Sequence, residues 1–167
     1  MNVFVLNRIN KMVDAHLTLC LFAVGFSLAV LGRALFQGIP SVDPLLPIIF
    51  LMAPSFSLKK AGFFGGMSYF VSNSVVWGGH GWWDIPMVVG AVLVGATGWF
   101  FRGHRFWGIL VATILYEVIV NSAWALMFGI QSLFTAIPFA LTHIGSNIVF
   151  VGIGLKLKEK FFGGGIK

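Results

Sequence analysis

The chain has 167 residues, of which 58% are hydrophobic and 10% are charged, and its mean hydropathy is +0.94. A soluble domain of this length could not bury so much apolar surface, so the composition excludes that class and predicts one all-α membrane domain over residues 1–167. The formal net charge of +6 does not indicate nucleic-acid binding, because the basic residues stand at the ends of apolar segments, where they set membrane topology.

Residues 1–14 form a short amphipathic lead-in, in which apolar residues are interspersed with Arg8, Lys11 and Asp14. We interpret this lead-in as an anchor that lies on the membrane surface. The apolar segment after it is longer than the core of a signal peptide and has no evident small-residue cleavage site. We therefore expect it to be retained as a first span over residues 15–36.

The first span contains two pairs of small residues at four-residue spacing, Ala23 with Ser27 and Gly25 with Ala29. Such pairs let two helices approach closely, either within the chain or with a partner. Arg33 stands near the far end of the span. We favour the interpretation that its side chain reaches out to the membrane interface over one in which it binds an anion.

The second and third spans both carry residues that shape a helix. The second, residues 44–58, is short and has three prolines, of which Pro54 should kink or break the helix by removing a backbone hydrogen bond. The third, residues 61–78, has Gly62 and Gly66 on one face, where a neighbouring helix can approach. It ends in a turn rich in glycine and tryptophan.

Three further spans are expected at residues 84–101, 106–128 and 136–155. Asp84 can cap the first of them, and Ala91 with Gly95 gives it a close-packing face. An uncharged loop at residues 129–135 joins the last two spans, and residues 156–167 form a basic tail. The predicted fold is thus a bundle of six transmembrane helices.

The lysines and arginines lie almost entirely on one side of this arrangement. With the N-terminus inside, ten of the eleven fall on the inner side and only Arg33 falls on the outer side. This is the positive-inside pattern, which predicts that both termini and the 156–167 tail are cytoplasmic. The expected location is the plasma membrane of a prokaryotic cell, crossed several times.

Polar and aromatic residues within the spans gather in their outer halves. Such side chains are unfavourable in a bilayer unless they are paired or face a cavity, so we expect one pocket that opens outward and binds a small molecule. The residues predicted to bind it are Asn73, Trp77, His80, Trp82, Glu117, Asn121, Trp124, His143 and Asn147. In such a pocket the aromatic rings would stack on a flat ligand and the polar groups would fix its edge.

Simpler interpretations stay open for several of these residues. Trp82 can belong to an interfacial aromatic belt. His143 with Asn147, or Glu117 with Asn121, can be hydrogen-bonded links between helices, and Glu117 with His143 can form a proton relay. The histidines lack metal-ligand spacing, and the sequence has no phosphate-binding loop, nucleophile elbow or HExxH motif. We therefore predict no metal, no other cofactor and no enzymatic activity.

Several stretches share a distinctive pattern of small and aromatic residues. They are residues 43–50, residues 60–73 with the turn at residues 77–83, and residues 137–150. This pattern resembles the substrate-binding S components of energy-coupling factor (ECF) transporters, a class of ABC uptake systems. The resemblance covers most of residues 43–155.

The resemblance implies a six-helix subunit that captures a vitamin-sized molecule or a metal ion from outside. It also implies partners, namely a transmembrane T component and two cytoplasmic ATPases. In this family a small-residue motif of the first span contacts the T component, and Ala23 with Ser27 is its nearest match here. Cobalt- and nickel-type members carry metal ligands at the extreme N-terminus, and the absence of histidine there favours an organic substrate.

Two other functions stay open from the sequence. The chain can be a self-sufficient small transporter or channel that uses Glu117 and His143 as a proton-coupled pair. It can also be a membrane scaffold that binds no ligand.

Overall fold

The computed structural model describes residues 3–76 and 79–162. Within these residues every element of secondary structure is a helix and no strand forms, which confirms the all-α prediction. The elements are α1 (Val3–Phe36), α2 (Leu45–Met52), the short 3-10 helix η1 (Ala53–Ser55), α3 (Leu58–Asn73), α4 (Asp84–Phe100), α5 (Arg105–Phe128) and α6 (Gln131–Phe162).

Among the described residues, three helices are long and apolar enough to cross a membrane. These are Met12–Phe36 within α1, Arg105–Phe128 and Gln131–Phe161. Many of their large apolar side chains point away from the bundle, as Leu35 and Leu126 do. A helix that is apolar on its outer face suits contact with lipid tails, so the chain is built as a membrane-embedded protein.

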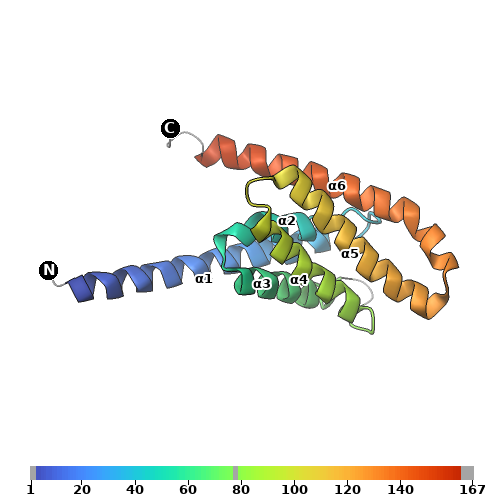
Figure 1. Cartoon of the computed structure of the whole chain (residues 1–167), viewed down its shortest axis with the longest axis horizontal. Helices are drawn as coiled ribbons and strands as arrows, with labels where there is room; N and C mark the ends of the chain where they lie inside the picture. The colour runs from blue at the N-terminus through green and yellow to red at the C-terminus, as the bar shows by residue number, and fades with distance from the viewer. Residues whose placement is uncertain (1–2, 77–78, 163–167) are drawn as a thin grey trace.

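The predicted lead-in and the first predicted span form one continuous helix. α1 runs from Val3 to Phe36, and its N-terminal half extends beyond the rest of the bundle (Figure 1). The sequence before Gly25 contains neither glycine nor proline, so nothing interrupts the helix near the expected boundary at residue 14.

Pro54 ends the second helix, as the sequence predicted. α2 stops at Met52, η1 follows, and Phe56 has an extended backbone with φ −121° and ψ 165°. At about 1.5 Å per residue, α2 and η1 together are much shorter than the roughly 30 Å of bilayer hydrocarbon. The second expected span is therefore a short helix in the centre of the bundle, where side chains such as Phe50 are fully buried.

The third helix is shorter than predicted and the sixth is longer. α3 ends at Asn73 instead of continuing to residue 78, and the last two positions of that range lie outside the described residues. The predicted loop at 129–135 is wrong over residues 131–135, because Gly129, with φ +88°, reverses the chain almost at once and α6 begins at Gln131. α6 then continues through the first part of the expected tail.

α3 and α4 pack with their backbones close together, as their small residues predicted. Gly62 and Gly66 lie against Val92 of α4, and a methyl group at Gly95 would run into the backbone carbonyl of Ala61. Glycine is therefore needed for this approach, and the pair forms a dense wall.

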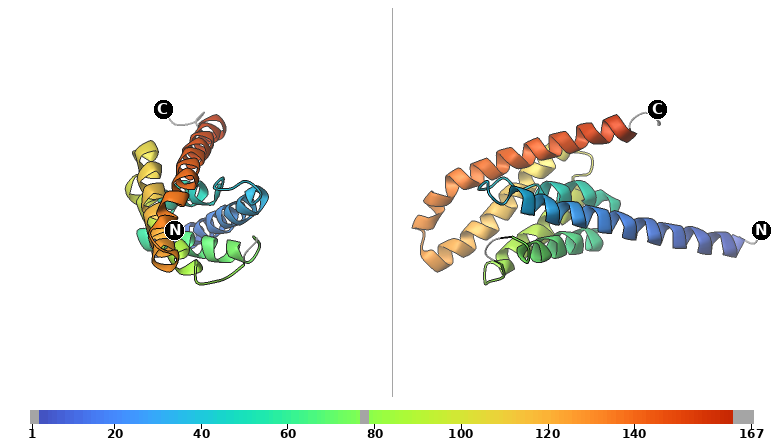
Figure 2. Two further views of the ribbon diagram at one scale, coloured as in Figure 1. Left: turned by 90° about the vertical axis from the view of Figure 1, so that its right-hand side faces the viewer. Right: turned by 180° about the vertical axis from the view of Figure 1, so that it is seen from behind.

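The helices alternate in direction, so the ends of α1, α3 and α5 lie at the same end of the molecule as the starts of α4 and α6. The start of α1 and the end of α6 lie at the opposite end (Figures 1 and 2). The polar residues discussed next gather at the end away from the termini.

Candidate ligand-binding cavity

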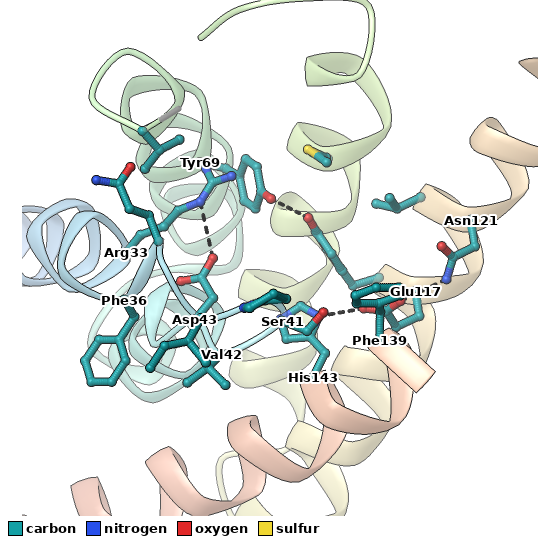
Figure 3. A pocket seen from close by; sticks show the side chains of 17 residues that line it. Arg33, Phe36, Ser41, Val42, Asp43, Tyr69, Glu117, Asn121, Phe139 and His143 are labelled. Atoms are coloured by element: carbon teal, nitrogen blue, oxygen red, sulfur yellow. Dashed lines mark hydrogen bonds and ion pairs between the residues drawn. The ribbon is translucent and has the colours of Figure 1, made fainter. Parts of the chain in front are cut away.

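A cavity of about 350 Å³ lies where the end of α1 and the 37–44 loop meet α3, α5 and α6. Four of its lining side chains can carry charge, namely Arg33, Asp43, Glu117 and His143. Figure 3 shows Arg33, Asp43 and Tyr69 on one side of the cavity and Glu117, Asn121 and His143 on the other. The structure thus brings three of the predicted site residues, Glu117, Asn121 and His143, to one space.

Arg33 lies at the centre of a network of contacts and does not reach out to the interface, so the favoured sequence interpretation is wrong. Its Nη1 donates to Oγ of Ser72 and to Oδ1 of Asn73, and its Nε lies 3.3 Å from Oδ2 of Asp43. Its guanidinium also stacks 4.2 Å from the ring centroid of Tyr69. With three acceptors and an aromatic face nearby, the charge is satisfied inside the bundle.

Asp43 fixes the loop between α1 and α2. Its Oδ1 accepts a hydrogen bond of 2.7 Å from the backbone N–H of Leu45, at the start of α2, while its Oδ2 faces Arg33. Burial raises the pKa of Asp43 above its usual value, and the positive charge of Arg33 and the Leu45 N–H oppose that rise. One carboxylate therefore joins the end of α1 to the start of α2.

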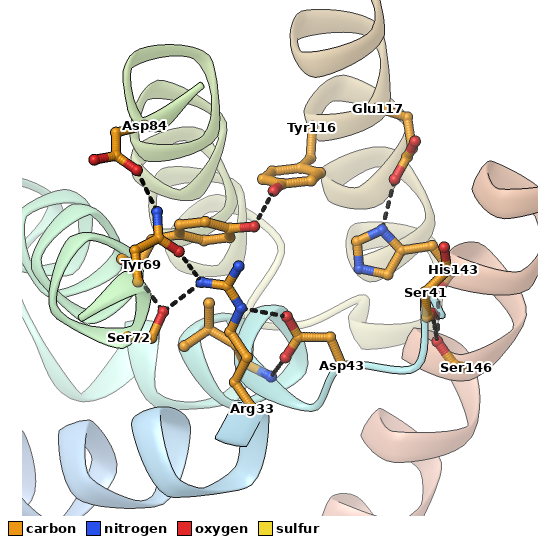
Figure 4. Close-up of polar contacts among 12 residues, drawn as sticks. Arg33, Ser41, Asp43, Tyr69, Ser72, Asp84, Tyr116, Glu117, His143 and Ser146 are labelled. Carbon is orange, nitrogen blue, oxygen red and sulfur yellow. Dashed lines mark hydrogen bonds and ion pairs between the residues drawn. The ribbon is translucent and has the colours of Figure 1, made fainter. Parts of the chain in front are cut away.

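The network continues from Asn73 to the turn before α4. Nδ2 of Asn73 donates to Oδ1 of Asp84, and Oδ2 of Asp84 lies 2.7 Å from Nδ1 of His80. Asp84 was expected to cap α4, but it is the first helical residue and makes no capping bond to the helix. Its carboxylate turns instead towards Asn73, His80 and the N–H of Gly81. We call Arg33, Asp43, Ser72, Asn73, Asp84 and His80 the arginine network. Figure 4 shows the part of it around Arg33.

A second cluster joins α5 to α6 on the other side of the cavity. Oε1 of Glu117 lies 2.5 Å from Nδ1 of His143, and Oε2 of Glu117 accepts a 2.8 Å hydrogen bond from Nδ2 of Asn121. Nε2 of His143 is buried and has no bonded partner among the described residues. We call Glu117, Asn121 and His143 the histidine cluster.

A pair of tyrosines lies between the two networks. The hydroxyl of Tyr116 donates to that of Tyr69 over 2.6 Å, and the Tyr116 ring meets the His143 ring edge-on at 5.6 Å. These are the only two tyrosines in the sequence, and the prediction missed both of them, as it missed Asp43. A signal was present, since a hydroxyl in an apolar span requires a hydrogen-bond partner.

The remaining predicted site residues lie at the margin of this cavity or outside it. Asn73 and Trp124 line an adjoining hollow of about 280 Å³, which also reaches Arg33. The rings of Trp82 and Trp124 lie edge-on to each other, with their centroids 5.0 Å apart. Trp77 lies outside the described residues.

Asn147 lies outside the cavities described here and links two helices. It is fully buried, and its Nδ2 donates to Oγ1 of Thr113 on α5 over 3.0 Å. Of the two interpretations that the sequence left open for Asn147, this contact agrees with a hydrogen-bonded link between helices and not with ligand binding. The His80 side chain is likewise held in the turn, between Asp84 and Oγ of Ser74.

Within the described residues, no group of three histidine, cysteine, aspartate or glutamate side chains is placed to hold a metal ion. No protein-family model, curated protein or solved structure matches this chain. The chemistry of the cavity is therefore inferred from its own residues.

Proposed function

We propose that the chain is the substrate-capture subunit of an uptake transporter, an S component of the ECF type, which binds a vitamin-sized molecule from outside the cell. The observation that carries this proposal is the cavity itself. Ionisable side chains are costly inside a membrane protein, and here Arg33, Asp43, Glu117 and His143 surround a space of about 350 Å³ with aromatic walls. Such an arrangement suits a small polar ligand.

The distribution of basic residues supports an outward-facing cavity. Lys59 and Lys60 stand at the start of α3, Arg102 in the α4–α5 turn, and Lys156 and Lys158 near the end of α6. The cavity lies at the opposite ends of these helices. By the positive-inside rule the basic end is cytoplasmic, which supports an orientation with both termini inside. The proposed subunit has six helices and lies in a prokaryotic plasma membrane.

The small residues of α1 support a partner on its outer face. Ala29 is fully buried and Gly25 packs against Met52, whereas Ala23 and Ser27 are exposed. In the proposal, the exposed pair contacts a transmembrane T component. Two cytoplasmic ATPases then supply the energy, since this sequence has no phosphate-binding loop.

A proton-coupled transporter is the second candidate. The 2.5 Å contact between Glu117 and His143 is the observation that favours it, because two titratable groups in contact can pass a proton. A ligand-free scaffold has less support, because it offers no reason to surround a cavity with charged groups.

Ser74, His80 and Asp84 are bonded in the order of a serine hydrolase triad, with Ser74 Oγ 2.9 Å from His80 Nε2. Ser74, however, caps the C-terminal end of α3, where carbonyl oxygens and the negative end of the helix dipole disfavour a developing oxyanion. We therefore propose a non-enzymatic role, in which the hydrogen bonds among these residues stabilise the turn between α3 and α4.

Native mass spectrometry of the purified chain, followed by reconstitution, tests the leading proposal. We expect a small molecule to co-purify and to rebind to the chain alone, while uptake into vesicles requires added ATPase partners. Uptake by this chain alone, driven by a proton gradient, would support the second candidate instead.

Cysteine labelling tests the orientation. The native Cys20 is exposed, so the labelling starts from a Cys20→Ser background. Single cysteines at Trp82 should react from outside, and those at Lys59, Arg102 and Lys158 only after the membrane is opened. Labelling of the Arg102 position from outside would contradict the proposed topology.

A further inference from the structure

The charges that face the cavity restrict the kind of ligand it can hold. Among the described residues that line it, Arg33 is the only arginine or lysine, and Asp43 and Glu117 add two carboxylates. With His143 as the fourth group, the net charge of the four is zero if the histidine is protonated and −1 if it is neutral. Asp84, bonded to Asn73 behind the arginine, adds a further carboxylate to that side. Neither state of His143 therefore leaves a net positive charge.

Two of the three nitrogens of the Arg33 guanidinium already contact protein groups. Nη1 donates to Ser72 and Asn73, Nε forms an ion pair with Asp43, and Tyr69 covers one face of the guanidinium. A ligand carboxylate or phosphate beside this guanidinium would lie close to the carboxylate of Asp43, and the two negative charges would repel each other. The cavity is therefore poorly suited to an anion.

Of the buried side-chain atoms without a hydrogen-bond partner among the described residues, only Nε2 of His143 belongs to a residue that lines this cavity. An ionised Glu117 only accepts hydrogen bonds, so Nδ1 of His143 carries the proton of their contact. Nε2 then presents a lone pair, and it has no partner among the described residues although the residue is only 8% exposed. Figure 4 shows this nitrogen turned away from Glu117, towards the side where Asp43 lies. A buried acceptor of this kind is unfavourable until a donor reaches it.

The walls add a preference of shape. The rings of Tyr69, Tyr116 and Phe139 line the cavity, and aromatic rings stack well on flat molecules. A further hollow of about 320 Å³, between α5 and α6, shares Asn121 and Phe139 with the cavity, and none of the described residues that line it carries a charge. This hollow can hold an uncharged part of the ligand that extends beyond the main cavity.

We propose that the cavity binds a flat nitrogen-containing molecule, cationic or neutral but not anionic, that donates an N–H to Nε2 of His143. This inference rests on the proposed substrate-capture function and specifies the chemistry of the substrate. The histidine cluster recognises the donor, while the arginine network keeps the opposite wall in place.

Three probes of one shape and different charge test the inference: benzamidine is cationic, benzamide neutral and benzoate anionic. The thermal unfolding of the full chain in detergent is measured with each probe at about 10 mM. We expect benzamidine and benzamide to raise the Tm by about 2–5 °C and benzoate to leave it unchanged, because a ligand stabilises the state it binds. His143→Ala should abolish these shifts. His104→Ala, an exposed histidine at the other end of α5, should keep them.

Each other outcome contradicts a different part of the proposal. A shift with benzoate that equals or exceeds the shift with benzamidine overturns the ligand class but leaves substrate capture standing. A benzamidine shift that survives in His143→Ala removes the histidine from recognition. If none of the three probes shifts the Tm and no molecule co-purifies, the ligand class and the proposed function both fail.

Discussion

The arginine network and the histidine cluster lie on opposite sides of one cavity, and they differ in how completely their groups are bonded. Arg33 has a partner on the 37–44 loop and two on α3, and Asn73 passes the contact on to Asp84 at the start of α4. The histidine cluster joins only α5 and α6, and it ends in a buried nitrogen with no partner among the described residues. A satisfied network fixes structure, whereas an unsatisfied group is available to a ligand.

The helices around the arginine network are also packed more closely than those around the histidine cluster. The arginine network rests on α3 and α4, where glycines bring two backbones together. The histidine cluster lies between α5 and α6, which enclose a further hollow near Asn121. The molecule therefore combines a dense wall with a looser one, and substitutions on the two sides should affect different measurements.

The largest expected effect comes from Arg33→Met. This change leaves Asp43, Ser72 and Asn73 without their shared donor, and breaking a buried ion pair typically costs about 3–5 kcal/mol. Thermal or denaturant unfolding of the purified variant measures the loss. The matched control is Arg102→Met, an exposed arginine at the basic end, which should change stability little. Equal losses in both variants would show that the network is not structural.

The Arg33→Met effect should also depend on pH. Burial already raises the pKa of Asp43, and loss of the opposing arginine charge raises it further. A carboxyl with a raised pKa in the folded state destabilises the fold as pH rises and is relieved when it binds a proton. Both folded-state pKa values of Asp43 lie above the ordinary pKa of aspartate, so the stability difference between parent and variant should shrink as the pH falls towards about 4. A difference that grows on acidification contradicts this explanation.

Gly95→Ala should have the next largest effect, because it forces apart the wall that carries the arginine network. The added methyl group would meet the backbone carbonyl of Ala61, and overpacking of this kind costs about 1–3 kcal/mol. Gly145→Ala on α6 is the control, since nothing lies within 4 Å of its new methyl group. There the better helix propensity of alanine should leave stability unchanged or slightly higher. The Tm of the two variants decides the matter.

On the looser side, Asn121→Ala and His143→Ala should weaken binding more than folding. Removal of one buried hydrogen-bond partner costs about 1–3 kcal/mol, or roughly tenfold to a hundredfold in affinity. The measurement is the Kd for the co-purified molecule or for benzamidine, with His104→Ala as the control. If both variants bind normally but melt earlier, these residues are links between helices and not ligand contacts.

The smallest effect is expected for Tyr116→Phe, between the two sides. It removes one hydrogen bond between neutral groups, worth about 0.5–1.5 kcal/mol. Tyr69→Phe removes the same bond but also alters the ring that lies under Arg33. Its effect on the Tm should therefore be at least as large. A larger loss for Tyr116→Phe would place that hydroxyl in a role beyond this pair.

The sequence by itself determined the class of the protein and most of its local structure. High apolar content indicated a helical membrane protein, and Pro54 marked the end of α2. Gly62 and Gly66 marked one close-packing face and Gly95 another, and the structure shows that these faces of α3 and α4 meet. These signals lie in single residues or in short spacings along one helix, so a contiguous stretch is enough to reveal them. The sequence also identified Glu117, Asn121 and His143 as polar groups at one depth.

Only the tertiary structure decided which of these polar groups meet. The partners of Arg33 stand at positions 43, 72 and 73, and Tyr69 is paired with Tyr116, so neither contact follows from spacing along the chain. Two helices can bring their side chains together or turn them apart, depending on how each is rotated about its axis, and packing sets that rotation. For this reason the sequence left Arg33 at the interface and placed Asn147 with the ligand. In the fold Arg33 lies inside the bundle, and Asn147 is bonded to Thr113.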